Sequence, residues 1–334
     1  MDIIVFILNK VVITGLVIGS VYALGAVGVT LIAGILRFSH FAHGDVMTMG
    51  AFISYVLAAM FASLGLHLPV ASGIIVLPVA MIITAIILYG FDLAFYRPLR
   101  RRGARPITLL IASIGVTMML QGVLRLFAGT DSYSFFENEP KVLYRVDLSW
   151  LGATRPLIMT QPQAFMIGLT VISCVALALF LTRSRLGKAM RAMSDNPSLA
   201  QVSGINTQLV VRVTWLIAGV LACLAGTMLA LDVQLKPDLA FNIILPIFAA
   251  AVVGGLGQPY GAIVGGFLVG FAETLAVFDW SVITKPFNAF LPSFITGAPN
   301  LALVPTEYKL VVSFVILVAV LLSRPTGIFK GVST

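Results

Sequence analysis

The chain is organised as long runs of apolar residues separated by short polar linkers. Each run holds roughly 18 to 27 residues, and a helix of that length crosses a hydrocarbon core about 30 Å thick. The pattern therefore predicts an all-α polytopic membrane protein with about eight or nine transmembrane helices, some of them broken. The apolar segments lie near residues 11–33, 45–64, 69–95, 107–128, 162–182, 209–231, 239–253, 261–279 and 307–323.

Composition supports the same class of protein. Hydrophobic residues make up 59% of the 334 residues and charged residues only 10%, whereas about a quarter of the residues of a soluble protein are charged. The first apolar stretch, residues 3–36, is too long for a signal-peptide core, so we expect it to be a membrane segment. Residues 1–334 are thus predicted to form a single transmembrane domain.

The formal net charge of +8 is concentrated in short linkers between apolar runs. This placement is typical of orientation signals in membrane proteins, and it argues against nucleic-acid binding. The linkers 96–106 and 184–207 are basic and are predicted to be cytoplasmic, as is the C-terminus. The loops 129–161, with mixed charges, and 280–306 are predicted to be periplasmic. The same count places the N-terminus outside.

Two short segments interrupt the apolar pattern. Backbone that is not helical at membrane depth survives only where protein or a water-filled cavity satisfies its polar groups, and paired interruptions in a transporter tend to mark the translocation route. Two tight turns at the membrane surface would explain the same pattern. The interruptions are residues 37–45, with the pathway candidates Phe41, His43 and Gly44, and residues 253–261, with the pathway candidates Gly254, Gly255 and Gly257.

Glu273 is the clearest ionisable residue within an apolar run, thirteen residues into the segment 261–279. Charged side chains at membrane depth are costly and therefore tend to have a function. Three interpretations remain open: a residue of the substrate path or gate, a partner across a subunit interface, or a side chain that reaches the outer surface.

The motifs of catalysis are missing from the sequence. There is no GxxxxGK[ST] phosphate loop, no HExxH pair and no GxSxG elbow, and only three histidines are present. We expect no catalytic residue, no metal site and no bound cofactor in this chain.

The linker 184–207 contains a short helix signal. Asn196 followed by Pro197 is an N-cap with proline at the first helical position, and Gly204 suits the position after the last turn. A helix over residues 197–203 would present Leu199, Ala200 and Val202. Such a helix suits docking into a groove on a soluble partner. A connector lying on the surface without a partner is the alternative.

The chain resembles the H-type permease subunits of the branched-chain amino acid (Liv) ABC importers over almost its full length. Several motifs in order carry the resemblance. They are GSVYALGAVGVTLIAG, FAHGD, TLLIASIGVTMMLQ, FAGTD, LGKAMRAMSDNPSLAQVSGIN, AAAVVGGLGQPYGAIVGGFLVGFAE and LLSRPTGIF.

The resemblance implies a type II-like importer permease in the bacterial inner membrane. The expected cargo is leucine, isoleucine and valine. The expected partners are a homologous M-type permease, two cytoplasmic ATPase subunits that bind ATP and Mg, and a periplasmic amino-acid-binding protein. Residues 196–204 would be the coupling helix. A urea or short-amide permease, or a stand-alone channel or secondary carrier, is the alternative. The stretch 37–40 before FAHGD and the long segment 280–306 depart from the usual family pattern.

Overall fold

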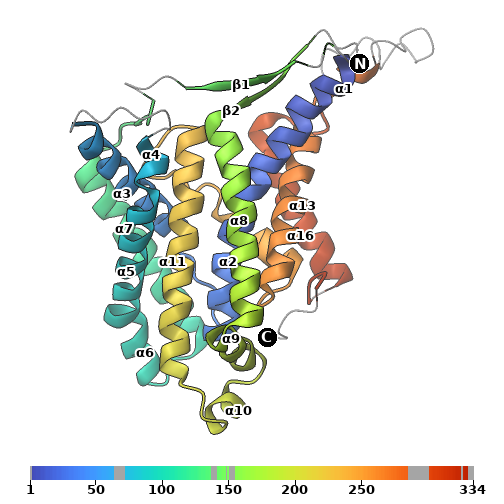
Figure 1. Cartoon of the computed structure of the whole chain (residues 1–334). Coiled ribbons are helices and arrows are strands. Elements are labelled where there is room, and N and C mark those ends of the chain that lie inside the picture. Colours follow the sequence, from blue (N-terminus) through green and yellow to red (C-terminus); the bar gives the residue numbers. More distant parts are fainter. Residues whose placement is uncertain are drawn as a thin grey trace.

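The computed structural model describes residues 2–63, 72–136, 141–147, 149, 155–284, 301–324 and 326–329. These residues form a bundle of long helices (Figure 1). Eight helices in the described part of the chain are long and apolar enough to cross a membrane, which agrees with the predicted eight or nine. They cover Asp2–Leu36, His43–Ser63, Leu77–Arg101, Pro106–Ala128, Gln161–Arg183, Thr207–Asp232, Pro259–Val277 and Thr306–Ser323.

Several of these spans join more than one element. The first combines α1 (Asp2–Ile7), the π-helix η1 (Leu8–Ile13) and α2 (Thr14–Leu36). The third combines α5 (Leu77–Phe91), η2 (Asp92–Tyr96) and α6 (Arg97–Arg101), and it follows α4 (Ser72–Ile75). The last combines η5 (Thr306–Tyr308) and α16 (Lys309–Ser323). The others are α3 (His43–Ser63), α7 (Pro106–Ala128), α8 (Gln161–Arg183), α11 (Thr207–Asp232) and α13 (Pro259–Val277).

Two segments differ from the predicted pattern. The segment 239–253 is not a full crossing, because only α12 (Ile244–Gly254) is helical there, and its 11 residues rise about 16 Å. The arginine-rich linker 96–106 is partly helical, since the third span continues to Arg101. Arginine is a good helix former, so the charge that ends the apolar pattern does not end the helix.

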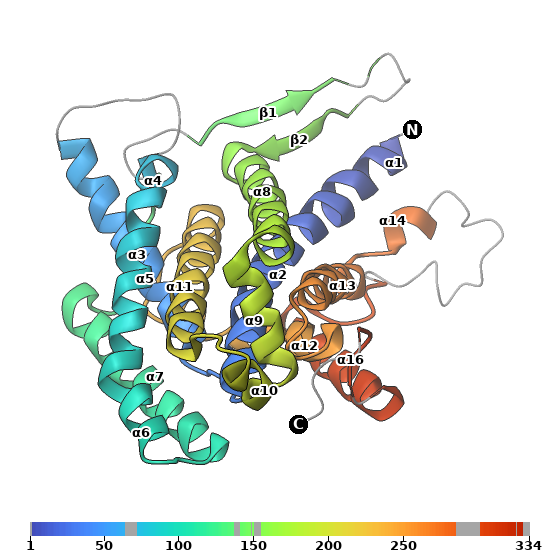
Figure 2. The same cartoon turned by 60° about the horizontal axis from the view of Figure 1, so that its bottom comes forward.

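α2 lies near the centre of the bundle in both views (Figures 1 and 2). It packs against α11, α12 and α13. Glycines set the distance between α2 and α13. A Cβ at Gly266 would lie 2.4 Å from the backbone of Ala23, and one at Gly270 would lie 2.6 Å from the backbone of Gly19. Small residues at this crossing let the two backbones approach closely, as in many membrane helix pairs.

The two ends of the bundle carry different structures (Figure 1). At the hairpin end, β1 (Leu143–Val146) pairs antiparallel with β2 (Leu157–Thr160), an addition to the predicted all-α fold. Near the same end are the chain start, α4 and α14 (Ser281–Thr284). At the α10 end lie α6, α9 (Arg185–Asp195) and α10 (Pro197–Val202). Most of the predicted loop 280–306 falls outside the described residues.

Candidate functional site

The predicted helix in the linker 184–207 is present as α10, one residue shorter than expected. The side chain of Asn196 accepts a hydrogen bond from the backbone N–H of Leu199 at 3.0 Å, so it is the N-cap. At the other end, the N–H of Ile205 donates to the carbonyl of Ala200, and Gly204 has a φ of 82°. This is the Schellman pattern, in which a left-handed glycine lets the chain leave the helix.

Fewer apolar residues of α10 are exposed than predicted. Leu199 is 63% exposed and Val202 is 86% exposed, whereas Ala200 is only 4% exposed. The prediction that Ala200 is presented to a partner is therefore wrong. Residues three apart share one face of a helix, so Leu199 and Val202 point outward together, while Ala200 faces α9 and the rest of its own chain.

α10 rests on α9, a second helix of the linker that was not expected from the sequence. Ser184 is the N-cap of α9, and its Oγ accepts from the N–H of Gly187 at 2.8 Å. Gly187, Met190 and Met193 are buried at spacings of three residues. This spacing was visible in the sequence, but the prediction treated the segment only as a basic linker, with Arg185, Lys188 and Arg191.

The first interruption enters the bundle instead of turning at its end. α2 ends at Leu36, and its C-cap residue Arg37 has a left-handed φ of 58°. The ring of His43 packs against Gly28, which lies nine residues before Arg37, or about 13 Å back along α2. Phe38, His40, Ala42 and His43 are buried. The segment therefore re-enters the bundle between the helices and is not a tight turn at the surface.

A polar stripe on α7 holds this segment in place. Ser113 Oγ accepts a hydrogen bond from the backbone N–H of Phe41 at 3.1 Å. Gln121 Nε2 donates to the carboxylate of Asp45 at 3.1 Å. The stripe consists of Ser113, Thr117, Gln121 and Arg125, spaced by four residues so that they share one face of α7. This regular spacing in an apolar run was a sequence signal that the prediction missed.

A buried aromatic cluster supports the same segment from the other side. His40 Nε2 lies 3.0 Å from the hydroxyl of Tyr96, and the rings of Tyr96 and Trp215 stack at 5.2 Å. Beside them, Asp92 forms an ion pair with Arg100 at 2.7 Å. The cluster ties the first interruption to η2 and α11.

The second interruption is the turn from α12 to α13. Gly255 and Gly257 have φ values of 108° and 85°, which favour glycine. Gly254 lies against Gly261, where a Cβ would come within 2.2 Å of a backbone oxygen, and Gly257 packs against Gly34 near the end of α2. The glycines are therefore required by backbone shape and close approach.

Both interruptions contact or adjoin α12. The ring of Phe41 stacks on that of Phe248 at 4.7 Å, in the middle of α12. Gly44 lies against Ile244 at the start of α12. The other pathway candidates, Gly254, Gly255 and Gly257, lie at its end. Six of the seven pathway candidates thus line up along α2 and α12. Their role in translocation remains a prediction.

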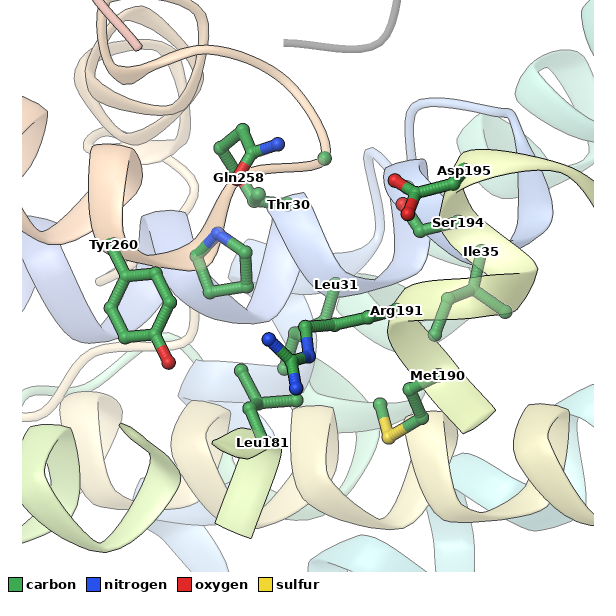
Figure 3. Close-up of a pocket in the computed structure, with 13 residues that line it drawn as sticks. Thr30, Leu31, Ile35, Leu181, Met190, Arg191, Ser194, Asp195, Gln258 and Tyr260 are labelled. Carbon is green, nitrogen blue, oxygen red and sulfur yellow. The ribbon is translucent and has the colours of Figure 1, made fainter. Parts of the chain in front are cut away.

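A cavity of about 240 Å³ lies between the second interruption, the end of α2 and α9 (Figure 3). Gln258 and Tyr260 belong to its α13 side, whereas Arg191, Ser194 and Asp195 belong to α9. Beside it, the guanidinium of Arg37 donates to the backbone carbonyl of Ser194 at 2.7 Å. The linker that carries α10 is therefore anchored to the C-cap residue of α2.

Glu273 lies apart from the other candidates, twelve residues along α13 from Gly261, or about 18 Å. It is 1% exposed and accepts hydrogen bonds from Tyr22 on α2, at 2.8 Å, and from Ser313 on α16. The interpretation that its side chain simply reaches the outer surface is therefore wrong. Its hydrogen bonds join three helices of the same chain.

In the described part of the chain, no group of three or more histidine, cysteine, aspartate or glutamate side chains is arranged to hold a metal ion. The site is therefore built from backbone turns, small residues and a few buried polar contacts.

Comparisons with known proteins identify relatives of this chain. The sequence profile "Branched-chain amino acid transport system / permease component" matches residues 11–321. The high-affinity branched-chain amino acid transport system permease protein LivH of Escherichia coli is 32% identical over 94% of this chain and 92% of the relative. The corresponding protein BraD of Pseudomonas aeruginosa is 30% identical over 95% of this chain and 94% of the relative.

Among solved structures, PsaBC from Streptococcus pneumoniae in complex with Fab matches with a TM-score of 0.43 and 16% identity, covering 94% of this chain and 90% of that chain. This similarity is too low to carry an argument. The sequence match includes all or most of each of the eight candidate membrane helices in the described part of the chain, and both interruptions. The chain belongs to the family of permease components of branched-chain amino acid transport systems.

Proposed function

We propose that this chain is the permease subunit of an ATP-driven importer that carries leucine, isoleucine and valine across the bacterial inner membrane as a multi-pass protein. The observation that carries the proposal is α10, a capped helix at one end of the bundle with two exposed apolar side chains, within a chain that matches the permease family over residues 11–321. A soluble partner would cover Leu199 and Val202.

The partners follow from this role. Two ATPase subunits hold ATP and Mg, since the sequence has no phosphate loop. An M-type permease lies beside this chain, and a periplasmic binding protein delivers the cargo. The basic residues of α6, α9 and their linkers support a cytoplasmic location for the α10 end, and the hairpin end is then periplasmic.

The contacts suggest how movement is transmitted. An ATPase that displaces α10 also displaces α9, on which α10 rests. Arg37 connects α9 to the end of α2, where the first interruption begins. The interruption in turn packs on α12 through Phe41 and Phe248. A shift at the α10 end would therefore reach both interruptions through direct contacts.

Co-expression with the two ATPases and the M-type permease tests the proposal. A stable complex whose ATP hydrolysis rises when leucine-loaded binding protein is added is the expected result. A chain that purifies without ATPases would contradict the proposal. Stimulation by a urea-loaded or amide-loaded binding protein, and not by a leucine-loaded one, would favour the urea or short-amide alternative.

A further inference from the structure

A second cavity, of about 430 Å³, lies toward the hairpin end between the first span, α13 and α16. Its lining combines both signs of charge with an apolar wall. The charged residues are Lys10, Lys309, Glu273 and Asp279, and the large apolar residues are Phe6, Ile18, Val277 and Phe278.

The two carboxylates of the cavity differ in what they bind. Asp279 accepts hydrogen bonds from the backbone and side chain of Ser281 and from the backbone of Leu301, so it holds the turn after α13. Glu273 accepts hydrogen bonds from the hydroxyls of Tyr22 and Ser313, which are neutral groups. A carboxylate has about four acceptor positions, so Glu273 retains capacity for a further donor.

Glu273 is a buried carboxylate that forms no ion pair in the described part of the chain. Within the described residues, no lysine or arginine lies within 4.0 Å of its oxygens. A buried anion is stabilised most when a cationic group donates a hydrogen bond directly to it, and the donors to Glu273 are neutral hydroxyls. Lys309 is four residues before Ser313 on α16, which places both on one face, about one turn apart. Lys309 therefore lies near Glu273 without forming an ion pair with it.

We propose that this cavity binds a zwitterionic aliphatic α-amino acid on the outer half of the permease. Glu273 receives the ammonium group, Lys309 and Lys10 receive the carboxylate, and the wall of Phe6, Ile18 and Phe278 contacts the side chain. An α-amino acid fits because it carries both charges on substituents of a single carbon atom. The inference rests on the proposed function, in which the hairpin end faces the periplasm and the cargo arrives there.

The test measures binding of radiolabelled leucine to the assembled permease and ATPase complex in phosphatidylcholine nanodiscs, without binding protein. Glu273→Gln, Lys309→Gln and Lys10→Gln should each weaken binding about tenfold, the effect of losing one charge-assisted hydrogen bond. Lys236→Gln is the matched control, because Lys236 is an exposed lysine that follows α11 and is absent from the cavity lining. It should bind as the wild type does.

Competitors give a signature that a structural role would not produce. 4-Methylpentanoic acid lacks the ammonium group and 3-methylbutylamine lacks the carboxylate, so neither should displace leucine from the wild type at tenfold excess over leucine. Glu273→Gln should reduce the preference for leucine over the acid, and Lys309→Gln should reduce the preference for leucine over the amine.

Phosphatidylethanolamine carries the same pair of charges in its headgroup, so the measurement is repeated with that lipid in the discs. The inference would be overturned if this lipid occupied the cavity and leucine did not displace it. Unchanged leucine binding in all three cavity variants would overturn it as well. The proposed function fails separately, when the complete wild-type importer does not take up leucine. Normal uptake by the complete importer, together with no leucine binding by the permease, contradicts only the proposal that the cavity binds an amino acid.

Discussion

Replacing the two exposed apolar side chains of α10 should detach the ATPases. Fully burying a leucine or valine side chain is worth about 1.5–3 kcal/mol. Leu199 is 63% exposed and Val202 is 86% exposed, so each would gain about 1–2 kcal/mol if a partner covered it completely. The double variant Leu199→Ser, Val202→Ser should therefore lose about 2–4 kcal/mol of association free energy, or at least about 30-fold in affinity.

Titration of detergent-purified permease with labelled ATPase subunit measures this loss directly. Gln201→Ser is the matched control, because Gln201 is an exposed polar residue of the same helix and its replacement removes no apolar contact. Neither leucine nor valine of α10 is buried in the permease, so expression and thermal stability should stay near wild type. Affinity of the double variant within about twofold of the wild type would mean that α10 is a surface connector and not the coupling helix.

Three further predictions concern neighbouring features. Gly204→Val should weaken ATPase association, because a β-branched residue costs about 1–2 kcal/mol at a left-handed φ of 82°. Gly204→Asn should be tolerated. Equal ATPase affinity of the two variants would refute the role of this turn. Arg37→Gly relieves a left-handed φ but removes the hydrogen bond to the carbonyl of Ser194. The complex should therefore assemble and hydrolyse ATP but move less leucine per ATP. An unchanged ratio of leucine moved to ATP hydrolysed would exclude Arg37 as a link between α9 and α2. An impermeant thiol reagent added to whole cells should label Tyr144→Cys in β1 and spare Arg102→Cys beside α6, and the reverse labelling would invert the orientation.

The membrane helices could be predicted from the sequence because their signal is strong and local. Long apolar runs leave few alternatives to spanning helices in a hydrocarbon core. α10 could be predicted for a similar reason, since Asn196, Pro197 and Gly204 each act on their own backbone neighbourhood. In both cases the residues that define the element lie within it.

The depth of the interruptions could not be predicted, because it depends on contacts between distant residues. Whether residues 37–43 turn at the surface or re-enter the bundle is decided by Gly28 beneath His43, by Ser113 on α7 and by Tyr96 on η2. The same limit applies to Ala200, whose burial depends on α9. It also applies to Glu273, whose partners are 251 residues before it and 40 residues after it.

Leucine uptake by the complete importer tests the central claim most directly. Proteoliposomes would contain this chain, the M-type permease and both ATPases, with ATP inside and leucine-loaded binding protein outside. We predict uptake that stops when ATP, the ATPases or the binding protein is omitted. Leucine movement by this chain alone, without ATPases, would identify a channel or secondary carrier and would contradict the assignment as an ATP-driven importer subunit.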